Sequence, residues 1–345
     1  MLNKISGVRI SCIASYLPPH KVYAKDYIPL FGEKKIRELV NGSGVESHYV
    51  ASDGMTSVDM SCMAAEHLLN KGDIDRNKID GLIFVTNSPD YIMPSSAYVI
   101  QARLGLNKDA FCIQTANGCP GFIYGMAEAA SLIAAKTCKH ILLLCGETNS
   151  RFFSKNNYLK IVFGDAASAV LIEEGDSEVC FSIHADGRHF KDVIIEAGGY
   201  RLPISAETCC EIIDEDGNHI TKEDMIEDGM VFMQQNILNM PRTFKEVLSY
   251  QNWEKEDLNL VAMQQTNRFM LDIMRKKYGI DSSICPSNIK ECGNVGPASI
   301  PLLLTMSLDT RKLSSYRKCI FLSMGVGIGW GAMTCDISQT QIFPV

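Results

Sequence analysis

Residues 117–135 read NGCPGFIYGMAEAASLIAA, and they decide the fold because the chain uses this pattern twice. The segment joins a glycine-rich turn to an apolar helical stretch, and residues 293–309, GNVGPASIPLLLTMSLD, repeat that arrangement. Two further pairs of similar segments are separated by about the same distance in the sequence, roughly 175 to 180 residues. IDGLIFVTNS from Ile79 matches LNLVAMQQTN from Leu258, and KHILLLCGE from Lys139 matches RKCIFLSMG from Arg317. The sequence therefore predicts one αβ unit that occurs in two duplicated halves.

Short β-rich apolar runs alternate with longer amphipathic stretches along the chain, which is typical of an α/β protein with buried strands. We expect strands at 7–15, 81–86, 110–114, 140–145, 167–172, 258–264, 318–324 and 330–336. We expect helices at 56–71, 97–104, 121–135, 225–249, 267–278 and 298–313. No linker rich in proline or glycine separates two domains, so we place the boundary of the halves between residues 175 and 176. The half 1–175 then carries the nucleophile, and the half 176–345 carries Gln264 and Asn294.

Composition excludes several classes of function. The net charge is -7, and because no extended run of Lys and Arg is present, we predict no nucleic-acid partner. The N-terminus lacks the long apolar segment of a signal peptide, and no apolar run approaches the roughly 18 residues of a membrane span. We therefore expect a cytoplasmic protein.

The chain has 13 cysteines. They include no CxxC pair, so the spacing signals neither a zinc site nor a disulfide framework, and we predict no metal. Most lie in apolar runs, where a free thiol behaves as a small buried hydrophobe. A chemically active cysteine therefore needs a special environment before it can be singled out.

Cys119 has such an environment. Pro120 and the flanking Gly118 and Gly121 are helix-start signals, which place the thiol at a helix N-terminus. Unpaired backbone N–H groups and the positive end of the helix dipole favour a thiolate there. We therefore expect a lowered thiol pKa and a reactive nucleophile.

Five segments together resemble the β-ketoacyl-acyl-carrier-protein synthase III family of the thiolase superfamily. They are Asn117 to Phe122 around the cysteine, FGDAA from Phe163, HADG from His184, GN with ASIP between Gly293 and Pro301, and GVGIGWG from Gly325. The resemblance spans nearly the whole chain. It implies a thiolase-like five-layer αβαβα fold and a homodimer.

The resemblance also implies roles for individual residues. Cys119 would be acylated, Asn294 would donate a hydrogen bond to a thioester carbonyl oxygen, and the N–H groups of Cys119 and Val326 would form the oxyanion hole. Phe163 and Asn267 would contribute to substrate and cofactor binding. No cofactor would be bound permanently. The substrate would be acyl-coenzyme A or an acyl thioester on the phosphopantetheine arm of an acyl carrier protein.

One position departs from the family pattern. The family's His-Gln-Ala-Asn motif reads Gln264-Gln265-Thr266-Asn267 here, so the predicted triad is Cys-Gln-Asn. A glutamine amide can hydrogen-bond to a carbonyl oxygen, but it cannot take or give a proton as histidine does. We therefore expect slow decarboxylative condensation. None of the seven histidines falls in a segment that we can place at the site.

A second departure lies at the expected coenzyme A entrance. Glu38 and Gly42 stand where family members have aromatic or cationic groups, and Asn157 stands where an arginine is common. Losing these groups removes partners for the phosphates and the adenine ring. A donor carried by an acyl carrier protein is therefore favoured over free coenzyme A.

These features favour an acyltransferase or condensing enzyme that forms an acyl thioester on Cys119, in fatty-acid or specialised acyl or polyketide biosynthesis. The missing histidine keeps an alternative open: a catalytically impaired partner subunit in a heterodimer with a paralogue. Thioester hydrolysis and non-decarboxylative condensation would use the same cysteine with a different acceptor. The sequence does not separate these possibilities.

Overall fold

The computed structural model describes residues 1–214 and 217–345. Its strands are β1 (Leu2–Tyr16), β2 (His20–Tyr23), β3 (Ser47–Val50), β4 (Gly81–Val85), β5 (Phe111–Thr115), β6 (His140–Thr148), β7 (Asp165–Ala185), β8 (Val193–Ile194), β9 (Ile212–Ile213), β10 (His219–Ile220), β11 (Ile226–Glu227), β12 (Leu260–Met263), β13 (Cys319–Gly325), β14 (Gly329–Cys335) and β15 (Gln341–Ile342). Its α-helices are α1 (Ile28–Phe31), α2 (Glu33–Ser43), α3 (Ser57–Lys71), α4 (Ser96–Arg103), α5 (Gly121–Ala134), α6 (Gly229–Gln251), α7 (Arg268–Tyr278), α8 (Ile289–Cys292) and α9 (Ser299–Ser307).

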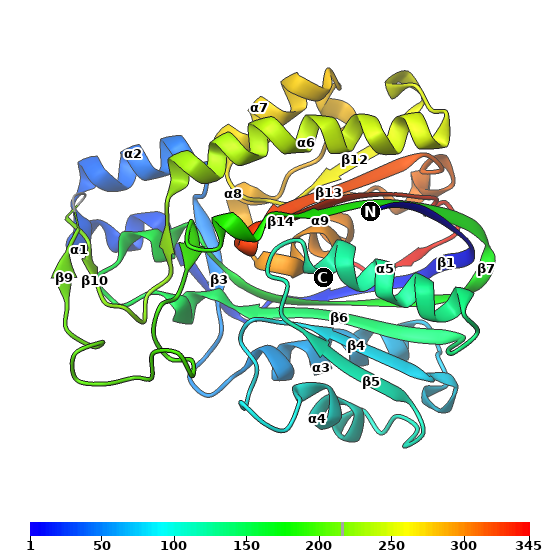
Figure 1. Ribbon diagram of the computed structural model, residues 1–345, viewed down its shortest axis with the longest axis horizontal. Helices are drawn as coiled ribbons and strands as arrows, with labels where there is room; N and C mark the ends of the chain where they lie inside the picture. The colour runs from blue at the N-terminus through cyan, green and yellow to red at the C-terminus, as the bar shows by residue number, and fades with distance from the viewer. Residues whose placement is uncertain (215–216) are drawn as a thin grey trace.

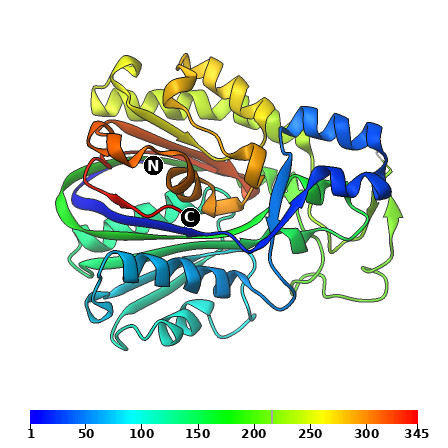
Figure 2. The ribbon, with the colours of Figure 1, turned by 180° about the vertical axis from the view of Figure 1, so that it is seen from behind.

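The elements stack in five layers, as the sequence predicted (Figure 1). Helices α6 and α7 cover one outer face, and α3 and α4 cover the other (Figure 2). Between them, the strands follow the order β12-β13-β14-β7-β6-β4-β5, with β1 paired along β7. Helices α5 and α9 form the middle layer, where they contact strands of both halves. The largest apolar core surrounds these two helices.

The two halves share a pattern of strand pairing. In the first half β4 is parallel to β6, which is antiparallel to β7. In the second half β12 is parallel to β13, which is antiparallel to β14. The matched sequence segments correspond to β4 and β12, to α5 and α9, and to β6 and β13. The repeat in the sequence is therefore a repeat in the architecture.

Strand β7 joins the halves, because its first part pairs with β6 and its last part pairs with β14. The boundary that we placed between residues 175 and 176 falls inside this strand. The β1–β7 register shifts at the same point, between the pairs Ser6↔Glu178 and Val8↔Glu174. The intervening Gly7 has a φ of 85°, a value that favours glycine. The halves thus meet where the pairing register of two continuous strands shifts.

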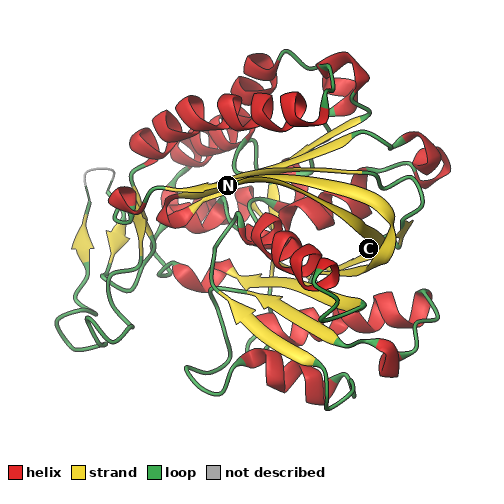
Figure 3. Cartoon of the chain, turned by 45° about the vertical axis from the view of Figure 1, so that its right-hand side comes forward, coloured by secondary structure: helices red, strands yellow, loops and turns green. Residues whose placement is uncertain are grey.

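Two expected helices have different ends. The expected helix 298–313 stops at Ser307, because Leu308 is extended and the Asp309 side chain caps a separate 3-10 turn. The helix expected from residue 225 begins at Gly229, because the preceding β11 pairs with β8. We did not predict α1, α2, α8, β2, β3, β15 or the short strands β8 to β11. Figure 3 shows β9 and β10 projecting from the layered body.

No helix within residues 1–214 and 217–345 combines the length and the apolar character that crossing a membrane requires.

Candidate active site

A pocket of about 390 Å³ opens where the two halves meet. Its walls come from α2, from β8 and β11, from the start of α6, and from the loops that follow β12 and β13. Most of its lining side chains are apolar. Five residues expected from the sequence line it together: Cys119, Phe163, Asn267, Asn294 and Val326. Residues from distant parts of the chain therefore converge on one cavity.

Cys119 lies two residues before α5, which starts at Gly121 with Pro120 as its N-cap. The buried face of α5, including Phe122 and Ile123, packs into the central core and fixes this turn. Ser323 of β13 donates a hydrogen bond of 2.9 Å to the Cys119 carbonyl oxygen. The position at a helix N-terminus is therefore as expected.

The expected lowering of the Cys119 pKa is wrong. Burial in the apolar pocket, together with the nearby carboxylates of Glu147 and Glu227, raises the thiol pKa to about 12. Hydrogen bonds from the Asn294 side chain and from the Cys119 backbone N–H act in the opposite direction but are weaker. Desolvation thus outweighs the helix terminus, because a thiolate in an apolar site loses its hydration.

Asn294 is held firmly beside Cys119. Its backbone N–H donates to Val162 O at 2.9 Å, and its carbonyl oxygen accepts from Gly164 N at 3.0 Å. Its side-chain Oδ1 accepts from Gly296 N at 3.0 Å and from Gln264 Nε2 at 2.9 Å. With Oδ1 occupied, the amide nitrogen is the end directed at the sulfur. Asn294 can therefore donate a hydrogen bond to a group on Cys119.

Gln264 lies behind Asn294 and does not line the pocket with Cys119. Its Nε2 donates to Asn294 Oδ1 at 2.9 Å and to Ser299 Oγ at 3.0 Å, which uses both amide hydrogens. The expectation that Gln264 could donate to a substrate carbonyl is therefore corrected. In this arrangement the residue positions Asn294 and leaves the access to Cys119 open.

The Cys119 backbone N–H makes no hydrogen bond to another residue in the described part of the chain, so it is available for a developing oxyanion. Val326 follows Gly325, which touches the nucleophile turn: a Cβ at Gly325 would lie 2.7 Å from Cys119 Cβ and 2.6 Å from Pro120 Cδ. Only glycine allows this approach of β13 to the turn. The end of β13 thereby brings Val326 to the pocket.

Phe163 and Asn267 take part in local structure as well as lining the pocket. The Phe163 ring packs against Phe153 with centroids 4.9 Å apart, and its backbone forms a bridge with Asn294. Asn267 Oδ1 caps α7 by accepting from Met270 N at 2.8 Å. Their role in binding a substrate stays a prediction.

Sequence reasoning missed two carboxylates near the thiol. Glu147, at the end of β6, is 1% exposed, and its oxygens accept from Asn87 N at 2.6 Å and from Ser88 Oγ at 2.8 Å. Burial raises its pKa to about 7. Glu227 of β11 lines the pocket, and burial also raises its pKa. Both lie in stretches without a motif, so only the fold brings them to Cys119.

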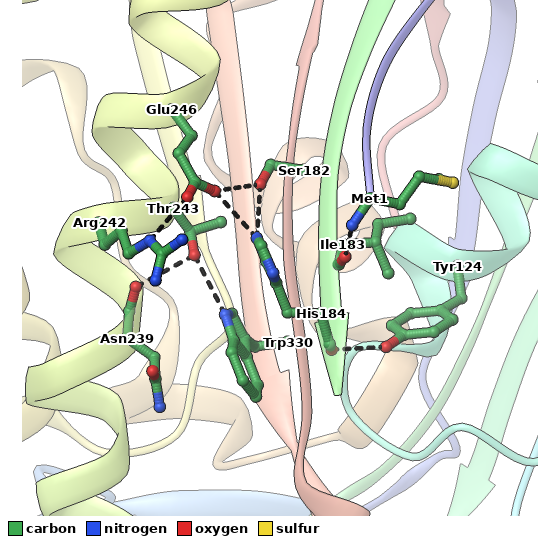
Figure 4. A network of polar contacts seen from close by, with 10 residues as sticks. All are labelled: Met1, Tyr124, Ser182, Ile183, His184, Asn239, Arg242, Thr243, Glu246 and Trp330. Carbon is green, nitrogen blue, oxygen red and sulfur yellow. Dashed lines mark hydrogen bonds and ion pairs between the residues drawn. The ribbon is translucent and has the colours of Figure 1, made fainter. Parts of the chain in front are cut away.

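No histidine is among the residues that line this pocket in the described chain. His184, from a segment that resembles the family, lies on the α6 side of β7 (Figure 4). Its Nε2 is 2.9 Å from Glu246 Oε2 and 2.8 Å from Ser182 Oγ, and its ring stacks on Trp330 with centroids 5.4 Å apart. This histidine therefore ties α6 to the sheet and does not serve Cys119.

The pocket entrance follows α2. Gly42 lines both the pocket and an adjoining open groove, where Glu38 also lies. Asn157 is buried and caps a 3-10 turn by accepting from Leu159 N at 3.0 Å. Lys34 and Lys35 border the same groove. Glu33 and Glu38 line this groove as well, and Lys34 Nζ lies 4.0 Å from Glu38 Oε1, so its lysines and glutamates balance in charge.

Comparison with known proteins gives consistent matches. Two family models match, "3-Oxoacyl-[acyl-carrier-protein (ACP)] synthase III" over residues 113–187 and the C-terminal model of the same name over residues 248–337. A putative 3-oxoacyl-[acyl-carrier-protein] synthase 3 of Campylobacter jejuni is 32% identical over 98% of this chain and 96% of its own. A β-ketoacyl-[acyl-carrier-protein] synthase III of Ehrlichia canis is 27% identical over 94% of this chain and 96% of its own.

Solved structures agree with the sequence matches. The crystal structure of a 3-oxoacyl-(acyl-carrier protein) synthase from Burkholderia xenovorans superposes with a TM-score of 0.93 at 27% identity, covering 100% of this chain and 98% of that one. A 3-oxoacyl-(acyl-carrier-protein) synthase III structure superposes with a TM-score of 0.90 at 28% identity, covering 95% of this chain and 99% of that one.

Proposed function

Since this chain belongs to the 3-oxoacyl-[acyl-carrier-protein] synthase III family of acyl-transferring condensing enzymes, we propose that Cys119 accepts an acyl group from a thioester and passes it on. One observation carries the proposal: Cys119 and Asn294 open together into one largely apolar pocket. An acyl chain fits such walls because its burial there is favourable. Fatty-acid or specialised acyl biosynthesis is the setting that we propose.

Acylation needs a nucleophile and a place for negative charge. The Cys119 sulfur attacks the thioester carbonyl carbon, and the donor thiolate leaves with a proton. The N–H groups of Cys119 and Val326 would stabilise the oxyanion of the tetrahedral intermediate. Because the pKa of the free thiol is about 12, few molecules carry a thiolate at neutral pH. The proton therefore has to leave as the donor arrives.

We propose that an acyl carrier protein delivers the acyl thioester to Cys119. Only the pantetheine arm and the thioester then enter the pocket, so the enzyme needs no site for adenine and its phosphates. Gly42 at the entrance and the buried Asn157 support this choice over coenzyme A.

The position of Gln264 favours an enzyme over a catalytically impaired partner subunit. A glutamine that filled the pocket would have blocked the thiol and supported the partner role. Gln264 instead hydrogen-bonds Asn294 and Ser299 from behind. Access to Cys119 is therefore compatible with acylation.

Intact-protein mass spectrometry tests the proposal. The purified chain is incubated with a panel of acyl-carrier-protein and acyl-coenzyme A donors, and we expect one acyl adduct that is absent in Cys119→Ala. Cys209 and Cys210 are exposed, so the double variant Cys209→Ser/Cys210→Ser, which should keep the adduct, controls for nonspecific acylation. If no donor gives a Cys119-dependent adduct, the proposal fails.

A further inference from the structure

The pocket contains an ionisable side chain that the proposed acylation does not use. Among the described residues, the only ionisable side chains that line the pocket are Cys119 and Glu227. No lysine, arginine or histidine shares these walls. The charge of Glu227 acts on the thiol, since it raises the Cys119 pKa. Glu227 therefore belongs to the immediate environment of the nucleophile.

Glu227 is placed by backbone structure. It is the last residue of β11 and pairs with Val193 of β8, which also lines the pocket. The next residue, Asp228, caps α6 by accepting from Val231 N at 3.0 Å. The residue is thus fixed between a strand pair and a helix start, and its side chain is partly buried.

The Glu227 carboxylate has no partner among the residues that the structure describes. Within residues 1–214 and 217–345, no side chain or backbone group donates a hydrogen bond to it, and no cation pairs with it. A partly buried carboxylate without a donor is costly, because burial removes hydration that nothing replaces. Such a group is ready to accept a proton or a hydrogen bond from a molecule that enters the pocket.

The other candidates for a base are committed elsewhere. Gln264 cannot take a proton, and both of its amide hydrogens are used. The Glu147 oxygens already accept from Asn87 N and Ser88 Oγ, and Glu147 does not line the pocket. Among the residues that the structure describes, only Glu227 combines an unpaired carboxylate with access to the cavity.

We propose that Glu227 is the general base that takes a proton from an uncharged hydroxyl or amine acceptor, which then removes the acyl group from Cys119. This inference rests on the proposed acylation of Cys119. It adds an acceptor class and a catalytic residue.

The step balances without an oxidant or a reductant. Glu227 takes the proton of the acceptor O–H or N–H as the O or N atom attacks the thioester carbon. The new C–O or C–N bond forms, and the oxyanion is held by the backbone N–H groups of Cys119 and Val326. The intermediate then collapses, the C–S bond breaks, and the Cys119 sulfur takes back the proton from Glu227.

The charges in and around the pocket favour an uncharged acceptor over a malonyl group. A malonyl carboxylate would enter an apolar cavity that already faces the Glu227 carboxylate, with no cation among the described residues of its lining. The like charges repel, and no histidine assists decarboxylation. An alcohol or a neutral amine meets no such penalty and supplies the hydrogen-bond donor that Glu227 lacks.

The experiment uses acyl-enzyme prepared with an acyl-carrier-protein donor and freed of excess donor. Loss of the adduct is followed by mass spectrometry after addition of n-propanol, of malonyl-carrier protein, or of hydroxylamine, which cleaves thioesters without a general base. We expect propanol to release propyl ester faster than malonyl-carrier protein consumes the adduct. We compare the rate of adduct loss with propanol to the rate with hydroxylamine. In Glu227→Gln this ratio should be about 100-fold lower than in the wild type.

Two further variants separate chemistry from folding. Glu227→Asp keeps a carboxylate and should recover part of the ratio, whereas Glu196→Gln, exposed and next to β8, should keep the wild-type ratio. A ratio in Glu227→Gln equal to that of the wild type would overturn the role of Glu227. Faster consumption by malonyl-carrier protein than by propanol would overturn the acceptor class. A wild-type chain that never acquires the adduct overturns the proposed function as well, so the two failures are distinguishable.

Discussion

A hydrogen bond joins Gln264 and Asn294, two residues of the proposed site. Gln264 Nε2 holds Asn294 Oδ1 at 2.9 Å, and this contact turns the Asn294 amide nitrogen towards Cys119. The amide of Gln264 can therefore orient the Asn294 side chain. A histidine at this position could also transfer a proton. The two side chains should behave as one unit in acylation.

A double-mutant cycle tests this coupling. Gln264→Leu removes both hydrogen bonds at similar volume, and Asn294→Ala removes the donor to Cys119. If Gln264 acts through Asn294, each single variant slows acylation by about 10-fold to 100-fold, and the double variant is scarcely slower than Asn294→Ala. Rates come from single-turnover mass spectrometry. Additive losses would contradict the coupling.

Glu147 makes the stability of the protein depend on pH. Its folded-state pKa is about 7, raised by burial from an ordinary value of 4.5. Between these values the folded state keeps a proton that the unfolded chain has released, so stability is greatest at the acidic end and falls as pH rises towards 7. Each pH unit in this range lowers the free energy of unfolding by about 1.4 kcal/mol, so it falls by about 3 kcal/mol between the two pKa values.

Urea unfolding at pH 5 to 8, followed by circular dichroism, measures this dependence. Glu147→Gln has no carboxyl group to titrate, so the unfolding free energy of the wild type minus that of the variant should decrease as pH rises from 5 to 7. Glu174→Gln, at an exposed position of β7, is the control and should leave the wild-type profile unchanged. If the unfolding free energy of the wild type minus that of Glu147→Gln stays constant over this pH range, the proposed role of Glu147 is wrong.

At the scale of elements, the approach of the end of β13 to the turn before α5 sets the geometry of the nucleophile. Gly325→Ala would push a methyl group against Cys119 and Pro120, at 2.7 and 2.6 Å. Overpacking of this kind costs about 1 to 3 kcal/mol, and a 1 Å displacement of the thiol lowers acylation about 100-fold. Gly229→Ala is the matched control, because a Cβ there meets nothing within 4 Å in the same pocket. Equal acylation rates in the two variants would argue against this contact.

Periodicity predicted the large elements because each of them buries a face. The strands β4, β6 and β13 are continuous apolar runs, and α5 carries the turn signals of its start. The two-residue strands β8 and β11 are too short to show any period, so the wall that carries Glu227 was missed. The motifs placed Cys119 and Asn294 together. The direction of the thiol pKa shift, however, depends on burial and on two carboxylates that are distant from Cys119 in the sequence.

At the scale of the whole molecule, β5 is the exposed end of the sheet path and carries an apolar surface. Phe111 is 41% exposed, and with Ile113 it borders a hollow of about 510 Å³ that also contacts Tyr124 and Leu132 of α5. Glu128 on the same surface has a buried oxygen without a hydrogen-bond donor in the described chain. An open edge strand with apolar flanks is a template for another strand. We propose that a second copy of this chain covers it.

Light scattering on a sizing column should then give a mass twice the 38.2 kDa of one chain. Phe111→Lys places a charge on the proposed interface and should shift the mass towards that of a monomer, since a buried unpaired charge opposes association. Phe190→Lys is the matched control, because Phe190 is 53% exposed and lies far from β5 in the sequence and outside this hollow. A monomeric wild type at micromolar concentration would refute the homodimer. If Phe111→Lys is still a dimer, the interface lies on another face of the molecule and not at the β5 edge.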